Sequence, residues 1–103
     1  MPQYQNQSSV EENTLSLHSE PPNYVVLLHN DDYTTMDFVV GVLEAVFHKS
    51  RSEAVEIMMR IHEKGVGVCG VYTKEIAEAQ VALVCKLVEA NGFPLLCTME
   101  REA

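Results

Sequence analysis

The chain has 103 residues, 47% of them hydrophobic, and a formal net charge of −8. This length predicts one domain, and the hydrophobic fraction is sufficient for a modest core. The acidic balance, with no cluster of Lys or Arg, disfavours nucleic acid as a partner, because its phosphates would be repelled. A cationic ligand is the better electrostatic match.

The first residues have the composition of a tail. Residues 1–22 are rich in Gln, Asn, Ser and Glu, contain no Lys or Arg, and end in Pro21-Pro22. Such a segment cannot bury enough apolar surface to offset the entropy that ordering would cost. We therefore expect a flexible, disordered tail over residues 1–22 and a core domain over residues 23–103.

Strand and helix signals begin after the tail. The run "YVVLLH", residues 24–29, is rich in β-branched residues and has the length of a strand. Thr34 or Thr35 can then cap a helix through "MDFVVGVLEAVFH", whose apolar residues recur at helical spacing. A Ser-x-x-Glu capping box at residues 50–53 opens a second helix, which Gly65 is suited to end.

The second half continues the same alternation. The run "VGVCGVY", residues 66–72, predicts a strand, Thr73 can cap a long helix that Gly92 ends, and "LLCTM", residues 95–99, predicts the last strand. This order predicts a small two-layer βααβαβ domain of the α+β class. A three-stranded antiparallel sheet would carry three helices on one face. The apolar stripe expected on the long helix consists of Ile76, Ala79, Leu83, Val84, Leu87 and Val88.

The residues that could support metal or thiol chemistry lack the usual patterns. The cysteines at 69, 85 and 97 are scattered, which is typical neither of a disulfide framework nor of a zinc site and fits a reducing cytoplasm. A thiol enzyme needs an exposed, activated cysteine, whereas Cys69 lies on an expected buried strand. Asp31 and Asp32 beside a histidine match no zinc or calcium spacing. We therefore predict no metal, no cofactor and no catalytic residues.

The stretch "GVGVCG", residues 65–70, spells the dinucleotide-binding pattern G-x-G-x-x-G. That fingerprint requires a strand before it and a helix after it, so that the pyrophosphate meets a helix N-terminus. Here the expected order is reversed, and we expect no nucleotide site. No apolar run is long enough to span a membrane and no signal peptide is recognisable, so we expect a cytoplasmic protein without membrane contact.

Two polar features could combine into a binding site. The loop after the first strand, residues 30–35, is by itself typical of a turn with a helix cap. Positions 58, 61 and 62 share one face of the second helix and are by themselves typical of a core stripe. The expected topology can bring the loop and this face together. A polar rim of Asn30, Asp31, Asp32 and His62 would then lie beside an apolar interior of Met36, Val39, Met58 and Ile61.

Such a pocket suits an ammonium group that lies next to a large apolar group. An ammonium has three donors and no acceptor, and burying it unpaired costs several kcal/mol. An amide oxygen, a carboxylate and a neutral imidazole nitrogen can accept all of its hydrogen bonds. A peptide N-terminus with a large first side chain has this chemistry.

From Pro21 to Glu102 the chain resembles the ClpS family, the adaptors of the bacterial Clp protease. The matching stretches are "PPNYVVLLHNDDYTTMDFV", "IMMRIHEKGVGVCGVYTKEIAE" and "PLLCTMER", in which N-D-D-Y-T, M-x-x-x-H and C-G-V-[FY]-T occur together. The resemblance implies a monomeric, non-enzymatic adaptor that binds N-degrons beginning with Leu, Phe, Tyr or Trp. It also implies delivery to the N-terminal domain of a ClpA-type AAA+ unfoldase for degradation by ClpP.

The resemblance also implies roles for individual residues. Asn30, Asp31 and His62 would hold the α-amine of the N-degron. The segment around Tyr72, Thr73, Glu75 and Gln80 would dock on the unfoldase, and the tail would take part in delivery. Met36 would act as a gate against β-branched first residues. The pocket for the first side chain would be lined by Asp32, Thr34, Met36, Val39, Met58, Ile61 and Leu95.

Three positions depart from the usual pattern of the family. His29 stands where an apolar residue is common, Thr35 where proline is frequent, and Gln80 where a basic residue is frequent. These differences are compatible with a paralogue of shifted specificity. The alternative hypothesis is a regulatory domain that binds the unfoldase and blocks other substrates without recognising N-degrons.

Overall fold

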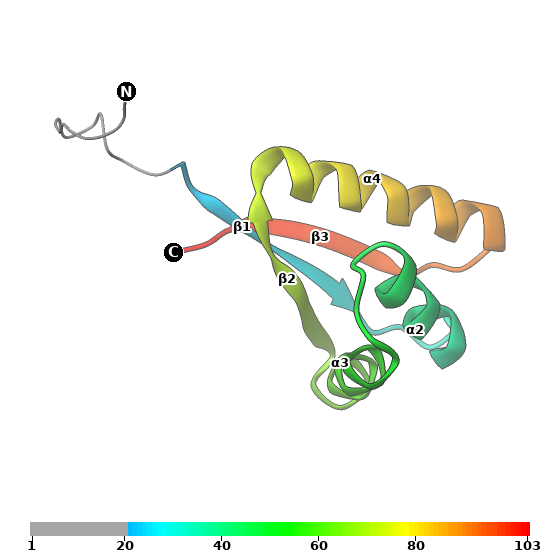
Figure 1. Ribbon diagram of the computed structural model, residues 1–103. Helices are drawn as coiled ribbons and strands as arrows, with labels where there is room; N and C mark the ends of the chain where they lie inside the picture. The colour runs from blue at the N-terminus through cyan, green and yellow to red at the C-terminus, as the bar shows by residue number, and fades with distance from the viewer. Residues whose placement is uncertain (1–20) are drawn as a thin grey trace, which may run out of the picture.

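The computed structural model describes residues 21–103, which form one sheet with three helices against it (Figure 1). The strands are antiparallel and lie in the order β2-β1-β3, so β1 is central. The predicted α+β class and element order are confirmed. The tail expected at residues 1–22 lies outside the described residues except for Pro21 and Pro22. The elements are β1 (Asn23–His29), α2 (Met36–Ala45), α3 (Arg51–Lys64), β2 (Val66–Thr73), α4 (Lys74–Asn91) and β3 (Leu96–Arg101).

Side-chain caps fix where the helices begin. The Thr35 hydroxyl accepts a hydrogen bond from the Phe38 N–H at 3.2 Å, so Thr35 and not Thr34 caps α2. Ser50 and Glu53 form the predicted reciprocal capping box at the start of α3. Thr73 caps α4, also as predicted. Each cap satisfies backbone N–H groups that have no partner within the helix.

The helix ends are less uniform. Gly65 and Gly92 end α3 and α4 in the left-handed conformation, with φ of 88° and 72°. The first helix was expected to run to His48 but ends at Ala45. His48 takes the left-handed position that glycine usually occupies, with φ 55°, and the Lys49 N–H then bonds to the Leu43 carbonyl at 3.1 Å. This turn directs the chain toward α3.

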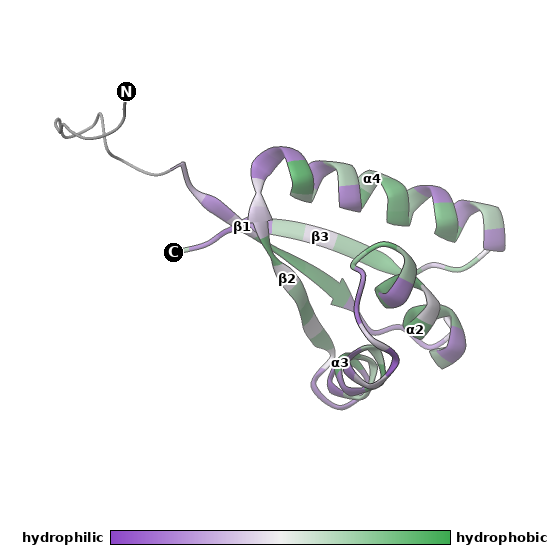
Figure 2. Ribbon diagram, viewed as in Figure 1, coloured by the Kyte–Doolittle hydropathy of each residue, from purple (hydrophilic) through white to green (hydrophobic). Residues whose placement is uncertain are grey.

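The core lies between the sheet and the helices. Val26 and Leu28 of β1 are fully buried, together with Cys69 of β2, Leu43 of α2 and Val84 of α4. Figure 2 shows that β1 and β2 are largely apolar, whereas purple and green segments alternate along α4. Within the described part of the chain, no helix is long and apolar enough to cross a membrane.

The buried face of α4 differs from the expected stripe. Val84, Leu87 and Val88 are buried or half-buried as expected. Ile76 and Leu83, however, are 50% and 44% exposed, and Ala79 is exposed as well. Ala77, Gln80 and Val81 occupy the inner face in their place. The helix carries apolar residues on two faces, and the periodicity alone did not identify the inner one.

Candidate functional site

The polar loop of residues 30–35 begins where β1 ends. β1 is paired on both sides, with β2 and β3, so the start of the loop is held by two ladders. The Asn30 N–H donates a hydrogen bond to the Gly65 carbonyl at 2.8 Å. His29 Nε2 lies 2.7 Å from Thr98 Oγ1 on β3. The loop is therefore attached both to the end of α3 and to the neighbouring strand.

Asp31 organises the rest of the loop. Its Oδ1 accepts hydrogen bonds from the N–H groups of Tyr33 at 2.8 Å and Thr34 at 2.7 Å, and its Oδ2 accepts one from the Thr34 hydroxyl at 2.7 Å. Burial acts to raise the pKa of the Asp31 carboxyl, but the hydrogen bonds from Thr34 and Tyr33 outweigh it and hold the pKa below its ordinary value. The carboxylate is thus ionised at neutral pH, and it still has one free acceptor position, on Oδ2.

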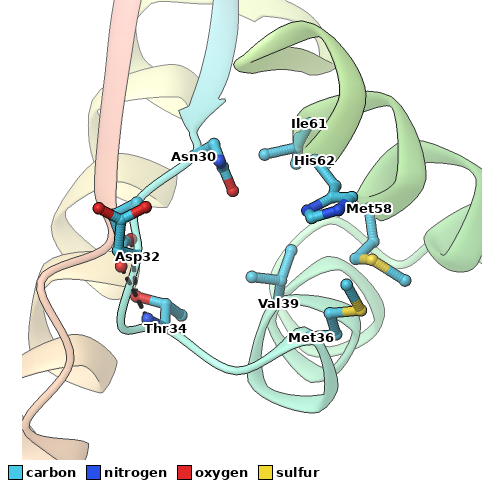
Figure 3. A pocket seen from close by; sticks show the side chains of 9 residues that line it. Asn30, Asp32, Thr34, Met36, Val39, Met58, Ile61 and His62 are labelled. Atoms are coloured by element: carbon cyan, nitrogen blue, oxygen red, sulfur yellow. Dashed lines mark hydrogen bonds between the residues drawn. The ribbon is translucent and has the colours of Figure 1, made fainter.

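A cavity of about 260 Å³ opens between this loop, α2 and α3. In Figure 3, Asn30 at the end of β1 and His62 on α3 extend toward the same space from opposite sides. The structure brings nine of the ten predicted pocket residues together around this cavity. They are Asn30, Asp31, Asp32, Thr34, Met36, Val39, Met58, Ile61 and His62.

The cavity has a polar mouth and an apolar interior. Asn30, Asp32 and His62 are exposed, whereas Val39, Met58 and Ile61 are buried. Met36 stands at the mouth with 47% of its surface exposed. Small-molecule sites typically measure roughly 300–1,000 Å³, so this volume suits a group about the size of one side chain.

Leu95, the tenth predicted pocket residue, lies slightly apart. It is 5% exposed and lines a much smaller cavity of about 10 Å³, together with His29, Thr34 and Ile61. Leu95 therefore supports the pocket from beneath the loop. His29 was not predicted to line a cavity, although its replacement of a commonly apolar residue was a signal.

A second hollow lies beside the start of α4. It is a groove of about 510 Å³ lined by Tyr72, Glu75 and Gln80, three of the four residues expected to dock on the unfoldase. Thr73 does not line it and instead caps α4. The Gln80 side-chain oxygen is buried without a hydrogen-bond partner among the described residues. Five further residues line the groove and were not predicted to do so: Val46, His48, Ile76, Ala79 and Leu83. The last three had been assigned to the apolar stripe of the long helix.

Two of the three cysteines, Cys69 and Cys97, are buried. Burial raises the pKa of both Cys69 and Cys97 to about 12, so these thiols stay protonated at neutral pH. Cys85 is exposed on α4. Over residues 21–103, no three His, Cys, Asp or Glu side chains are grouped closely enough to hold a metal ion.

Comparison with known proteins identifies the family. Residues 19–98 match the family model described as ATP-dependent Clp protease adaptor protein ClpS. The chain belongs to the ClpS family. A ClpS adapter protein from Oleidesulfovibrio alaskensis is 62% identical over 81 residues, which cover 79% of this chain and 78% of that protein. One from Desulfatibacillum aliphaticivorans is 58% identical over 82 residues, or 80% of this chain and 79% of that protein.

A solved structure supports both the family and the fold. It is Agrobacterium tumefaciens ClpS2 bound to L-phenylalaninamide, which is 41% identical to this chain. The match has a TM-score of 0.78 and covers 81% of this chain and 100% of that chain. The three-stranded sheet and the helices of this chain are therefore those of a ClpS domain.

The hydrogen bonds of Asp31 predict an acid-sensitive loop. A folded-state pKa below the unfolded one stabilises the protein above the unfolded pKa, and this contribution is lost as the pH falls through the folded pKa. Asp31→Asn should lower the free energy of unfolding at neutral pH by about 1 kcal/mol, and the difference from wild type should shrink on acidification.

Urea unfolding between about pH 7 and pH 3 measures this difference. Asp32→Asn is the matched control, because it removes the neighbouring charge and none of the three hydrogen bonds that Asp31 accepts. An Asp31→Asn deficit that stays constant over the whole pH range would contradict the role of the ionised carboxylate.

Proposed function

We propose that this chain is a non-enzymatic adaptor that binds the first residue of N-degron substrates and delivers them to a ClpA-type unfoldase for degradation by ClpP. The observation that carries the proposal is the 260 Å³ cavity, whose mouth is polar and whose interior is apolar. A free α-amine with a large first side chain is the ligand that satisfies both parts. The L-phenylalaninamide of the Agrobacterium tumefaciens ClpS2 structure has this chemistry.

The polar mouth recognises the α-amine. Asn30 and His62 face each other across the opening (Figure 3), and the Asp31 carboxylate lies in the same loop as Asn30. An ammonium needs three acceptors, for which the Asn30 amide oxygen, the free position of the Asp31 carboxylate and a ring nitrogen of His62 are available. A carboxylate in this group matches the positive charge, so the contact is charge-assisted.

The apolar interior provides most of the affinity. Asp32, Thr34, Met36, Val39, Met58, Ile61 and Leu95 line or support the space for the first side chain. An aromatic side chain buries roughly 150–250 Å². At about 25 cal/mol per Å², that burial is worth roughly 4–6 kcal/mol before the costs of association. The substrates are therefore proteins that begin with Leu, Phe, Tyr or Trp.

Delivery requires a second surface, and the groove beside α4 is suited to it. The groove is apolar along Ile76, Ala79 and Leu83, with Glu75 and Tyr72 on its border. Gln80 contributes a buried acceptor without a partner among the described residues, and leaving such an atom unpaired costs about 1–3 kcal/mol. Rotation of the Gln80 side chain on docking would let this oxygen accept a hydrogen bond from the N-terminal domain of the unfoldase.

Binding of short peptides tests the proposal directly. A labelled peptide with a free N-terminal Phe or Leu should bind, and its N-acetylated form should bind about tenfold to a hundredfold more weakly, because acetylation removes the charged donor. Fluorescence anisotropy of the two peptides measures the difference. Equal binding of both forms would refute recognition of the amine.

The same titration addresses a second candidate function, a domain that binds the unfoldase and blocks other substrates without recognising N-degrons. The groove beside α4 favours this candidate, because it is separate from the cavity. A chain that binds the unfoldase but neither peptide would establish the second function in place of the first.

Met36 stands at the mouth of the pocket and would act as a gate against β-branched first residues. Its exposed side chain would collide with the branch of a first residue such as Ile or Val. Met36→Ala should therefore increase the affinity for peptides that begin with Ile or Val by about tenfold. Met59→Ala is the matched control, since Met59 is 39% exposed on α3 and does not line the cavity. If Met36→Ala leaves the Ile and Val affinities at the wild-type level, the gate is refuted.

If the groove is the docking surface, a substitution in it should weaken binding of the unfoldase without changing the affinity for N-degron peptides. Leu83→Glu should weaken binding of the unfoldase N-terminal domain by about tenfold or more, because it places a charge in an apolar contact. Peptide affinity should stay at the wild-type level. Val55→Glu, which changes an exposed apolar residue on α3, is the control. Unfoldase binding that is unaffected by Leu83→Glu would exclude the groove as the docking surface.

A further inference from the structure

Gly67 lies where α3 packs against β2. It is buried on β2 and pairs with Leu28 of β1, so it belongs to the face of the sheet that the helices cover. The chain reaches it directly from Gly65, which ends α3. Gly67 itself lines neither cavity beside the polar loop.

The space that a side chain at position 67 would occupy is filled by Ile61. A Cβ added to Gly67 would lie 2.6 Å from Ile61 Cγ1 and 3.4 Å from both Ile61 Cδ1 and the Ile57 carbonyl oxygen. Real Cβ atoms essentially never approach another heavy atom within 3.0 Å. Glycine at this position therefore permits α3 and the Ile61 side chain to lie directly on the strand.

The other glycines show that this contact is specific. A Cβ at Gly41, Gly65 or Gly92 would meet nothing within 4 Å. At Gly70 a Cβ would collide with the ring of Tyr72, which lines the groove beside α4 and not the cavity. Only the contact at Gly67 involves a residue of the pocket.

Ile61 connects this contact to the binding cavity. Its side chain is 2% exposed and lines both the 260 Å³ cavity and the smaller one beneath the loop. A β-branched side chain in a helix has essentially one favoured rotamer, so Ile61 cannot simply turn aside. Because the cavity is the open space next to it, a side chain at position 67 would push Ile61, together with this turn of α3, toward the cavity.

We propose that Gly67 is a specificity-determining residue of the N-degron pocket. It acts as a positioning residue through Ile61: the absence of a side chain at position 67 lets Ile61 lie back on β2, and this leaves the pocket deep enough for aromatic first residues. This inference rests on the proposed function, because it describes the preference of the same site. It adds a residue that does not touch the ligand.

The test compares peptides that begin with Trp, Phe and Leu, all with a free amine. Gly67→Ala should reduce the affinity for the Trp peptide relative to the Leu peptide by about tenfold, which is the effect of one misplaced methylene in an apolar pocket. In the Ile61→Ala background, adding Gly67→Ala should leave the ratio of the two affinities unchanged, because the displaced side chain is absent. Non-additivity of this kind identifies a direct coupling.

Gly41→Ala is the matched control, since it makes the same substitution on α2 where nothing lies within 4 Å. Circular dichroism of each variant verifies folding. If Gly67→Ala alone fails to fold while the double variant with Ile61→Ala folds, the contact with Ile61 is supported. If both fail to fold while Ile61→Ala alone folds, glycine is required by the strand itself and the proposal is overturned.

Two further results would overturn the inference. One is a Trp-to-Leu preference in Gly67→Ala equal to that of wild type. The other is a change of that preference by Gly67→Ala that is equally large in the wild-type and Ile61→Ala backgrounds. Failure of the proposed function is distinguishable, because then the wild-type chain itself binds none of the free-amine peptides. Thermal unfolding of the same variants would in that case still measure the coupling between positions 61 and 67.

Discussion

The hydrogen bond from the Asn30 N–H to the Gly65 carbonyl joins the end of the central strand to the end of α3. Gly65 can present its carbonyl there because its left-handed conformation stops the helix and returns the chain into β2. β2 then pairs along the whole of β1. The polar loop and the face of α3 that carries His62 are consequently held beside each other by backbone geometry. The cavity between them is a result of this arrangement, and its side chains need only be of suitable size and polarity.

The polar and the apolar residues of the site contribute differently to it. Asp31 uses three acceptor positions on its own loop, which keeps the loop in one shape and leaves limited capacity for a ligand. The exposed polar mouth is screened by water, so under the proposed function it would discriminate between ligands more than it would increase affinity. The buried interior of Val39, Met58 and Ile61 supplies the apolar contact. Under the proposed function, affinity and selectivity would therefore come from different residues of the same cavity.

Local sequence signals predicted the order and the caps of the elements well, but they predicted the end of α2 and the buried face of α4 poorly. The capping box of Ser50 and Glu53 and the C-terminal glycines could be predicted because their hydrogen bonds join residues a few positions apart. The end of α2 could not be predicted, because His48 adopts a left-handed conformation that is usually taken by glycine. The buried face of α4 could not be identified from the sequence, because the helix also carries exposed apolar residues on a second face. Nine pocket residues could be grouped from the expected topology and the family resemblance. The close approach of Gly67 to Ile61 depends on how α3 packs on β2, which no local pattern predicts.

The stretch "GVGVCG" shows why a pattern needs its structural context. Its first glycine ends a helix, its second admits Ile61, and its third makes room for the Tyr72 ring. Gly67 lies near the start of β2, beside the pocket, and Tyr72 lies near its end, beside the groove. One strand thus connects the two candidate surfaces, and it pairs with β1 on both sides of a bulge at Cys69. An adaptor needs only to hold its substrate at a fixed place relative to its partner. Under the proposed function, this strand would hold the pocket and the groove at a fixed separation.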